Sequence, residues 1–326
     1  MKSIDQSYKD LLKSIILNGN RKSDRTGTGT ISLFGYQLHH NMQDGFPILT
    51  SKRVYWKGVV GELLWFLKGD TNIKYLVENN INIWNGDAYK RFTTWYDNYK
   101  HPVQLEIVPS TFVDFYKLGR LTLEEFTNRI LSDNEFSEHF GDMGPIYGWQ
   151  WRKSYRHPDQ IKNLIDDLKN NPDSRRLIVD SWNPEFIPSM VLPPCHYSFQ
   201  CNTRLLENGE RELSLMFNMR SWDVFLGGPF NLASYGLLLQ ILCKLTNMVP
   251  GKLVASSADT HLYQNHLQAV DEFLETEESE HQPCITFSDR VDFNNGIDGF
   301  LNTCDISDIV LTNYHPTKTI KAPLSN

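Results

Sequence analysis

The sequence predicts one large α+β domain in which a mixed sheet is covered by helices. Segments with helical spacing and segments with strand-like alternation follow one another without a βαβ repeat. No run rich in proline, glycine or serine divides the 326 residues into separate units. One long segment, NLASYGLLLQILCKLTN, is apolar on most sides and needs neighbours that bury it. Residues 1–326 are therefore assigned to one domain.

The N-terminal elements follow from hydrophobic spacing. Five apolar residues share one face of a predicted first helix: Tyr8, Leu11, Leu12, Ile15 and Ile16. Gly19 is a natural end for that helix. The glycine-rich run DRTGTGT predicts a loop, and the alternation in ISLFGYQLHH predicts a strand. KGVVGELLWFLK, residues 57–68, predicts a largely apolar helix that Gly69 ends.

The middle of the chain differs from its surroundings. Residues from about 86 to 140 are polar and aromatic without a repeated motif, which predicts a helical insertion at the surface of the domain. A stripe of four apolar residues then predicts a helix over 159–169: Ile161, Leu164, Ile165 and Leu168. RRLIVDSWNP and ELSLMFNMRS predict two strands, and the long apolar helix follows them. The C-terminal part mixes short strands and loops.

Composition and charge argue against several classes of protein. The chain has 40% hydrophobic and 22% charged residues, which is typical of a soluble globular protein. Its net charge of −7 argues against nucleic acid as the main partner, although a local arginine cluster can still bind a phosphorylated ligand. No apolar run approaches a membrane span, and the N-terminus, with its scattered charges, does not resemble a secretory signal.

Five cysteines occur without a CxxC pair: Cys195, Cys201, Cys243, Cys284 and Cys304. This odd number predicts neither a disulfide framework nor a zinc site, and no metal-ligand motif or GxGxxG appears. Reduced thiols are typical of a cytoplasmic protein.

Cys195 stands in VLPPCHYSFQ, where two prolines stiffen its approach and fix where the thiol points. An isolated cysteine is most often a small buried hydrophobe. It becomes a nucleophile at neutral pH when nearby positive charge stabilises its thiolate. Four arginines in turn or strand-edge contexts offer such charge: Arg25, Arg175, Arg176 and Arg220. Taken singly, each is typical of a solvated surface charge, but together with neighbouring hydroxyls they predict an oxyanion site.

Glu62 is the one charge in the apolar segment GELLWFL. In such a segment a glutamate must be buried or line a cavity, and burial raises a carboxyl pKa into the range useful for proton transfer. The alternative is a glutamate at the helix edge that faces solvent.

Seven motifs occur along the chain in this order: DRTGTGT, ELLWFLKGDTNI, GPIYGWQWR, DSRR, LPPCH, RSWDVFLGGPFNLASY and DTHLYQNH. In these motifs and their order the chain resembles the thymidylate synthase family from about residue 20 to its C-terminus, interrupted mainly by the 86–140 segment. The resemblance implies a thymidylate synthase-like fold and reductive methylation of dUMP to dTMP with 5,10-methylenetetrahydrofolate. It implies no metal or nicotinamide, and its active form would be a cytoplasmic homodimer that needs neither membrane nor nucleic acid.

The same resemblance suggests how the nucleotide is bound and attacked. Cys195 resembles the nucleophile that attacks C6 of uracil, which makes C5 a carbon nucleophile. Arg220 would lie near the thiol and lower its pKa. The implied phosphate ligands are Arg25, Arg220 and Ser221, with Arg175 and Arg176 reaching the phosphate from the other subunit.

Asn231 resembles the amide that reads the uracil edge, because its donor and acceptor match O4 and N3–H. The related deoxycytidylate hydroxymethylases have an aspartate at this place. On its own, Asn231 is also a candidate N-cap for a helix that begins at LASYGLLL. His261 and Tyr263, in DTHLYQNH, resemble the pair that binds the sugar 3′-hydroxyl.

Glu62 resembles the carboxylate that organises water and proton transfer around C5 and O4, and His196 is expected to support the thiol structurally. At the folate site, Asp223 would bind the pterin ring and Trp84 would shield the reactive methylene group. The remaining folate-site residues implied by the resemblance are Tyr147, Gly227, Gly228 and Phe230.

Several positions depart from the family pattern. Met219 stands where a glutamine usually precedes the arginine, Gly228 replaces a bulky aliphatic residue, and Tyr55 stands near a usual histidine. NGDAY follows Trp84, and the chain ends in Asn326 rather than a small apolar residue. A cavity beside Gly228 and a polar C-terminus would admit water and yield 5-hydroxymethyl-dUMP, whereas Trp84 would shelter the methylene until reduction. The alternative functions are a dUMP hydroxymethylase and a catalytically silent RNA-binding or regulatory homologue.

Overall fold

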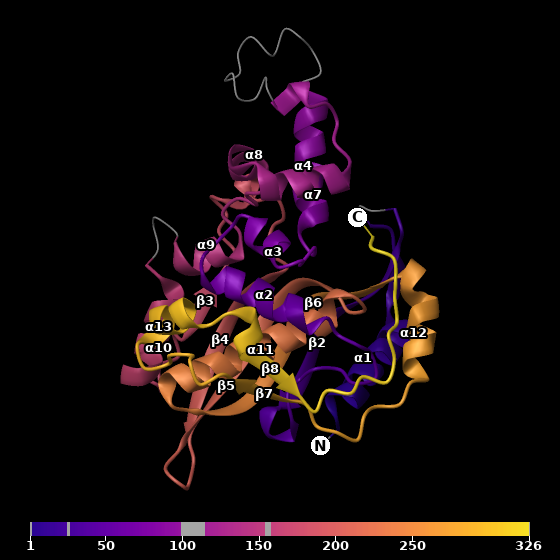
Figure 1. The fold of residues 1–326 in the computed structure, drawn as a ribbon. Coiled ribbons are helices and arrows are strands. Elements are labelled where there is room, and N and C mark those ends of the chain that lie inside the picture. Colours follow the sequence, from indigo (N-terminus) through magenta and orange to yellow (C-terminus); the bar gives the residue numbers. More distant parts are fainter. Residues whose placement is uncertain (1, 25–26, 99–114, 154–157, 326) are drawn as a thin grey trace.

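A six-stranded sheet organises the computed structural model, which describes residues 2–24, 27–98, 115–153 and 158–325 (Figure 1). In spatial order the strands are β1 (Asn20–Lys22), β2 (Thr30–Asn41), β6 (Val249–Tyr263), β5 (Arg211–Asp223), β4 (His196–Leu205) and β3 (Ile178–Asp180). β5 and β6 pair parallel, and the other neighbouring pairs are antiparallel. The predicted α+β domain with a mixed sheet is confirmed, although β4 and β6 were not among the predicted strands.

The long apolar segment forms α11 (Gly227–Thr246), which connects the parallel strands β5 and β6. Parallel neighbours require such a crossover, because the chain must return to the same end of the sheet. β5, α11 and β6 therefore form a βαβ unit, and the strand pairings of the described residues include no second parallel pair. α11 packs against β5, β6 and α2 (Trp56–Leu67), which explains why residues around most of its circumference are buried.

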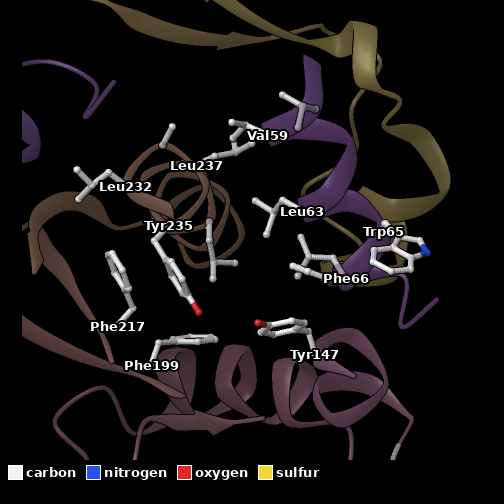
Figure 2. Close-up of a cluster of buried hydrophobic side chains, with 14 of the residues drawn as sticks. Val59, Leu63, Trp65, Phe66, Tyr147, Phe199, Phe217, Leu232, Tyr235 and Leu237 are labelled. Carbon is white, nitrogen blue, oxygen red and sulfur yellow. The ribbon is translucent and has the colours of Figure 1, made fainter. Parts of the chain in front are cut away.

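α2, α11 and the sheet share one hydrophobic core (Figure 2). Phe66 of α2 lies near Tyr147, with ring centroids 4.8 Å apart. Tyr235 of α11 stacks on Phe217 of β5, with centroids 4.2 Å apart and ring planes at 3°. These contacts bring the start of α9 (Tyr147–Arg152) and the middle of α11 close to the first residue of β4 and to the C-terminal end of α2.

The first helix, α1 (Ile4–Asn18), packs on β2 and β6. Tyr8, Leu11, Leu12 and Ile15 are buried as predicted, but Ile16, at the edge of the predicted face, is exposed. The other helices outside the predicted insertion are α3 (Lys74–Glu78), α10 (Gln160–Asn170), α12 (Leu267–Leu274) and α13 (Gly296–Thr303). Two short strands, β7 (Cys284–Phe287) and β8 (Ile309–Thr312), form a separate ribbon.

The described part of the predicted insertion includes α4 (Asn85–Asn98), α7 (Leu123–Ser132) and α8 (Asn134–Phe140), which stand at one end of the molecule (Figure 1). Their buried aromatic rings pack together around Phe92, whose ring lies 5.4 Å from Phe126 and 5.7 Å from Phe136. That this region is an insertion stays a prediction. Among all described residues, no helix combines the length and apolar character that crossing a membrane requires.

Candidate active site

Cys195 lies at the entry to β4, and its backbone is held from two directions. Its amide donates to the Tyr147 hydroxyl at 2.8 Å, and its carbonyl accepts from the Arg220 amide at 2.9 Å. Tyr147 begins α9, whereas Arg220 belongs to β5. The position of the thiol is therefore set jointly by a helix and by the neighbouring strand.

The Arg220 guanidinium lies beside that thiol. Nη2 is 3.7 Å from Cys195 Sγ, while Nε and Nη2 each donate at 2.8 Å to the carbonyls of Pro194 and Pro193. The stiff proline pair thus holds the arginine as well as the cysteine. Cys195 remains half-buried, unlike Cys243 in α11, where burial raises the thiol pKa to about 12.

An open pocket of about 450 Å³ borders Arg220. Its other lining residues come from β3, β4 and the turn after β3: Ile178, Asp180, Trp182, Tyr197 and Ser198. This volume lies within the range of small-ligand sites. One face of the guanidinium thus borders a hollow that has room for a ligand.

Glu62 points from α2 toward Trp84, whose indole Nε1 donates to Glu62 Oε1 at 2.8 Å. Burial raises the pKa of this carboxyl to about 7, and the hydrogen bond from Trp84 lowers it only in part. Glu62 is half-buried and its carboxyl pKa is raised, as expected, so the solvent-facing alternative is wrong.

His196 is sandwiched between two tyrosines. Its ring stacks on Tyr147 with centroids 4.1 Å apart, and its Nδ1 lies 2.8 Å from the Tyr235 hydroxyl. Burial lowers the pKa of His196 to about 3, so the imidazole is neutral at neutral pH. Tyr235 was not predicted as a site residue. The signal was available, because Tyr235 follows Asn231 by four positions and shares its helix face.

Asn231 lies inside the first turns of α11, which begins at Gly227, so the predicted N-cap role is wrong. The cap position belongs to Leu226, which makes no side-chain hydrogen bond to the helix. Asn231 Oδ1 instead lies 3.2 Å from the indole Nε1 of Trp222, the donor in this pair. The Asn231 amide is thus hydrogen-bonded to Trp222 near the end of β5 and does not cap the helix.

The parallel register of β5 and β6 brings together residues that are far apart in the sequence. Ser221 lies opposite Asp259, and Asp223 lies opposite His261. Asp223 Oδ1 accepts from the amides of Phe225 and Leu226 at 3.0 and 3.2 Å, which fixes the turn into α11.

The two residues predicted to bind the sugar also lie along β6. The rings of His261 and Tyr263 meet edge to face with centroids 5.3 Å apart, and His261 Nδ1 is 3.5 Å from Asp259 Oδ1. In the described part of the chain, no group of three histidine, cysteine, aspartate or glutamate side chains is placed to hold a metal ion.

Gly228 has no cavity beside it, which corrects the expectation of one. A β-carbon at this position would overlap the Tyr8 hydroxyl and would come within 3.4 Å of Trp222 Nε1. At Gly227 the nearest contact of an added β-carbon would be Asn231 Oδ1 at 3.7 Å. Phe230, the fifth residue of LGGPFN, packs toward Gly58 of α2.

Of the predicted arginines that the structure describes, Arg175 and Arg176 do not lie beside this thiol. Arg25 lies outside the described residues, and Arg175 and Arg176 are exposed in the turn before β3. Leu177, the next residue, hydrogen-bonds to the Cys201 amide. Cys201 is six positions along β4 from Cys195, or about 20 Å at the rise of a strand. Of the four predicted arginines, only Arg220 is seen beside Cys195.

Comparison with known proteins gives matches over nearly the whole chain. A family model described as thymidylate synthase matches residues 6–326. A thymidylate synthase of Listeria monocytogenes is 43% identical over 327 residues, which cover 98% of this chain and 99% of the relative. One from Mycoplasma genitalium is 40% identical over 311 residues, which cover 95% of this chain and 97% of the relative.

Proposed function

The chain belongs to the thymidylate synthase family and is a methyltransferase that makes dTMP from dUMP, and from this premise we propose which of its residues carry the reaction. The observation that carries the proposal is the Arg220 guanidinium, 3.7 Å from Cys195 Sγ and anchored on both proline carbonyls. A fixed positive charge beside a thiol favours the thiolate, which is the nucleophilic form.

Cys195 is the nucleophile in this proposal. Its thiolate forms a bond to C6 of the uracil ring, the C5–C6 double bond is lost, and C5 becomes nucleophilic. The co-substrate 5,10-methylenetetrahydrofolate supplies the one-carbon unit and the hydride. Tyr147 and Arg220 act by holding the Cys195 backbone, so that the sulfur meets the ring in one orientation.

Glu62 is the proton-transfer group. A carboxyl whose pKa is about 7 is close to half protonated at neutral pH, so it can accept and return a proton without a large energetic cost. Trp84 holds one carboxyl oxygen and so fixes the direction in which Glu62 acts. His196, neutral and bonded to Tyr235, supports the thiol segment as a structural residue.

The remaining proposed site residues bind the nucleotide and the folate. Arg25, Arg220 and Ser221 bind the phosphate, Asn231 reads the uracil edge, and His261 with Tyr263 binds the sugar. The folate lies against Trp84, Tyr147, Asp223, Gly227, Gly228 and Phe230. The T-shaped pair of Trp84 and Tyr147, with centroids 6.2 Å apart, supports this assignment because it offers an aromatic wall beside Glu62.

The active form is a homodimer in which Arg175 and Arg176 serve the phosphate of the partner subunit. Two observations support this. These arginines precede Leu177, which pairs with Cys201, and Cys201 is about 20 Å along the strand direction from Cys195. In addition, the uncovered face of the sheet has a hollow of about 390 Å³, bordered by residues such as Gln200, Met216 and Val254, which a second copy would cover.

A reducing compartment suits a nucleophilic thiol, so we place the enzyme in the cytoplasm. Neither a membrane nor nucleic acid is a proposed partner. The hydroxymethylase alternative loses its main argument, because the Tyr8 hydroxyl fills the space beside Gly228 through which water would enter.

The test is a product assay with dUMP and 5,10-methylenetetrahydrofolate. The expected result is dTMP, identified by mass, together with dihydrofolate in equal amount. Tetrahydrofolate with 5-hydroxymethyl-dUMP would contradict the proposed hydride transfer, because water would then have completed the reaction.

A further inference from the structure

The indole N–H of Trp222 donates a hydrogen bond to the side-chain amide of Asn231, which is proposed to read the base. Trp222 is fully buried on the core side of β5, and its Nε1 lies 3.2 Å from Asn231 Oδ1. We propose that Trp222 holds the Asn231 amide in the single orientation that reads uracil, which makes it a positioning residue for nucleotide specificity. The inference rests on the proposed function, because it takes Asn231 as the group that pairs with the base.

The orientation of an amide decides which pyrimidine it can read. Uracil presents an acceptor at O4 and a donor at N3, so it needs Nδ2 and Oδ1 of the asparagine in that order. Cytosine presents an amino donor and an unprotonated N3 acceptor, so it needs the amide turned by half a rotation. An asparagine free to turn would serve both bases, and a fixed one serves uracil alone.

Trp222 can stabilise only one of the two orientations, because an indole nitrogen donates and never accepts. With Oδ1 toward the indole, the N–H is satisfied and the second lone pair of Oδ1 remains for uracil N3–H. With the amide turned, its NH2 group would face the indole N–H, and a buried donor would lose its partner. The free-energy cost of an unpaired indole N–H therefore disfavours the amide orientation that would pair with cytosine.

The surroundings of the indole keep it in this place. The rings of Tyr8 and Trp222 meet edge to face with centroids 6.5 Å apart. Tyr8 in turn donates its hydroxyl to the Val224 carbonyl. A β-carbon at Gly228 would come within 3.4 Å of Trp222 Nε1 and would overlap the Tyr8 hydroxyl. The glycine that departs from the family pattern is thus what admits both rings beside Asn231.

The experiment measures the dissociation constants of dUMP and dCMP for the full-length protein without folate, so that turnover plays no part. Wild type should prefer dUMP, and Trp222→Phe should lose about five- to tenfold of that preference, the effect of one net hydrogen bond. Trp151→Phe is the matched control. Trp151 is equally buried and donates its indole N–H to Ser181 Oγ at 2.7 Å, but it does not contact Asn231.

Each outcome bears on the inference. A Trp222→Phe protein that keeps the wild-type ratio overturns it, and so does an equal loss in Trp151→Phe, which would indicate a general packing effect. If Trp222→Phe does not fold, Trp222→Met gives the same test, because methionine fills irregular space and has no N–H donor. A wild type that binds dUMP and dCMP equally would instead refute the role of Asn231 in the proposed function, and the inference with it.

Discussion

Burial shifts the pKa values of Glu62 and His196 in opposite directions, and this difference separates the roles of the two residues. It raises the pKa of Glu62 to about 7 and lowers that of His196 to about 3. The cause is the same in both cases, since a poorly solvated site disfavours the charged form. At neutral pH, His196 is therefore a neutral hydrogen-bonding group. Glu62 is the one of the two that can exchange protons with a substrate.

Replacing the nucleophile should separate binding from chemistry. In Cys195→Ser, turnover of dUMP should fall on the order of ten-thousandfold or more, because a hydroxyl beside Arg220 is not ionised at neutral pH. Binding of dUMP, measured by calorimetry, should stay largely intact. Cys284→Ser, which changes an exposed cysteine on β7, is the matched control and should keep its turnover. Retained turnover in Cys195→Ser would exclude the covalent mechanism.

The raised pKa of Glu62 predicts a pH-dependent stability. Between its ordinary value of 4.5 and about 7, the folded protein keeps a proton that the unfolded chain has released. The stability from this group is therefore complete below about pH 4.5 and is lost as the pH rises through about 7. Glu62→Gln removes the cost of burying the charge, so it should gain on the order of 2 kcal/mol relative to wild type between pH 5 and pH 8.

Urea unfolding of both proteins at the two pH values measures this difference. Glu78→Gln, at an exposed position in α3, is the control and should show no such dependence. A difference between Glu62→Gln and wild type that is the same at both pH values would contradict the assigned pKa. Turnover of Glu62→Gln should fall about a hundredfold or more, as expected when a proton-transfer group is lost.

At the scale of elements, the start of α11 is closely packed. Two glycines in a row begin this helix, yet their surroundings differ. An added β-carbon at Gly227 would find ordinary contact at 3.7 Å, whereas one at Gly228 would overlap the Tyr8 hydroxyl. The entry of α11 is thus closely packed against α1 on one side only.

This difference predicts opposite effects of one small substitution. Gly228→Ala should destabilise the protein by about 1–3 kcal/mol, because Tyr8 and Trp222 must move. Gly227→Ala, its matched control, should be neutral or stabilising by up to about 1 kcal/mol, since alanine favours a helix more than glycine does. Denaturant unfolding of the two variants checks the pair. Equal effects would show that the space beside Gly228 is not filled as described.

The strand β6, which lies inside the sheet, was not predicted from the sequence for a physical reason. β6 contains Pro250 and the run ASSADT, whose residues favour strands weakly. It is a strand because β2 and β5 pair with it on both sides. The edge strand β3 has three residues, fewer than the sequence predicted. It is short because it pairs with β4 on one side only.

At the scale of the whole molecule, the phosphate role proposed for Arg175 and Arg176 would make the dimer part of the active site. Arg220 lies beside Cys195, but Arg175 and Arg176 are on the exposed turn before β3. If Arg175 and Arg176 act across a two-fold interface, both subunits supply arginines that bind one phosphate. Activity then depends on the dimer and not only on the intact fold of one chain.

Mixing two inactive variants tests this arrangement. Cys195→Ser subunits keep the arginines, and Arg175→Ala/Arg176→Ala subunits keep the thiol. After subunit exchange, a hybrid dimer holds one complete site, so the mixture should recover about a quarter of wild-type activity. Steady-state assays before and after exchange give the measurement.

A mixture of Cys195→Ser with Arg220→Ala is the control and should recover nothing, because both residues belong to the same site within one subunit. If the arginine double variant also fails to complement Cys195→Ser, the two arginines act within their own subunit and the proposed interface is wrong.

The sequence by itself determined the helical stripes of α1 and α10, the buried apolar helix α11, and the family. These follow from local spacing and from ordered motifs, which do not depend on what each element packs against. It also predicted the raised pKa of Glu62, because a carboxyl in an apolar segment has few other outcomes.

Only the tertiary structure decided what surrounds Gly228 and Asn231. The space beside Gly228 is filled by Tyr8, which bonds to Val224 across 216 positions of the chain, and Asn231 is held by Trp222 rather than capping a helix. Hydrophobic periodicity reports which face of an element is buried, but not which distant side chain covers it. The partner of a buried polar group is therefore set by the packing of α1, β5 and α11 against one another.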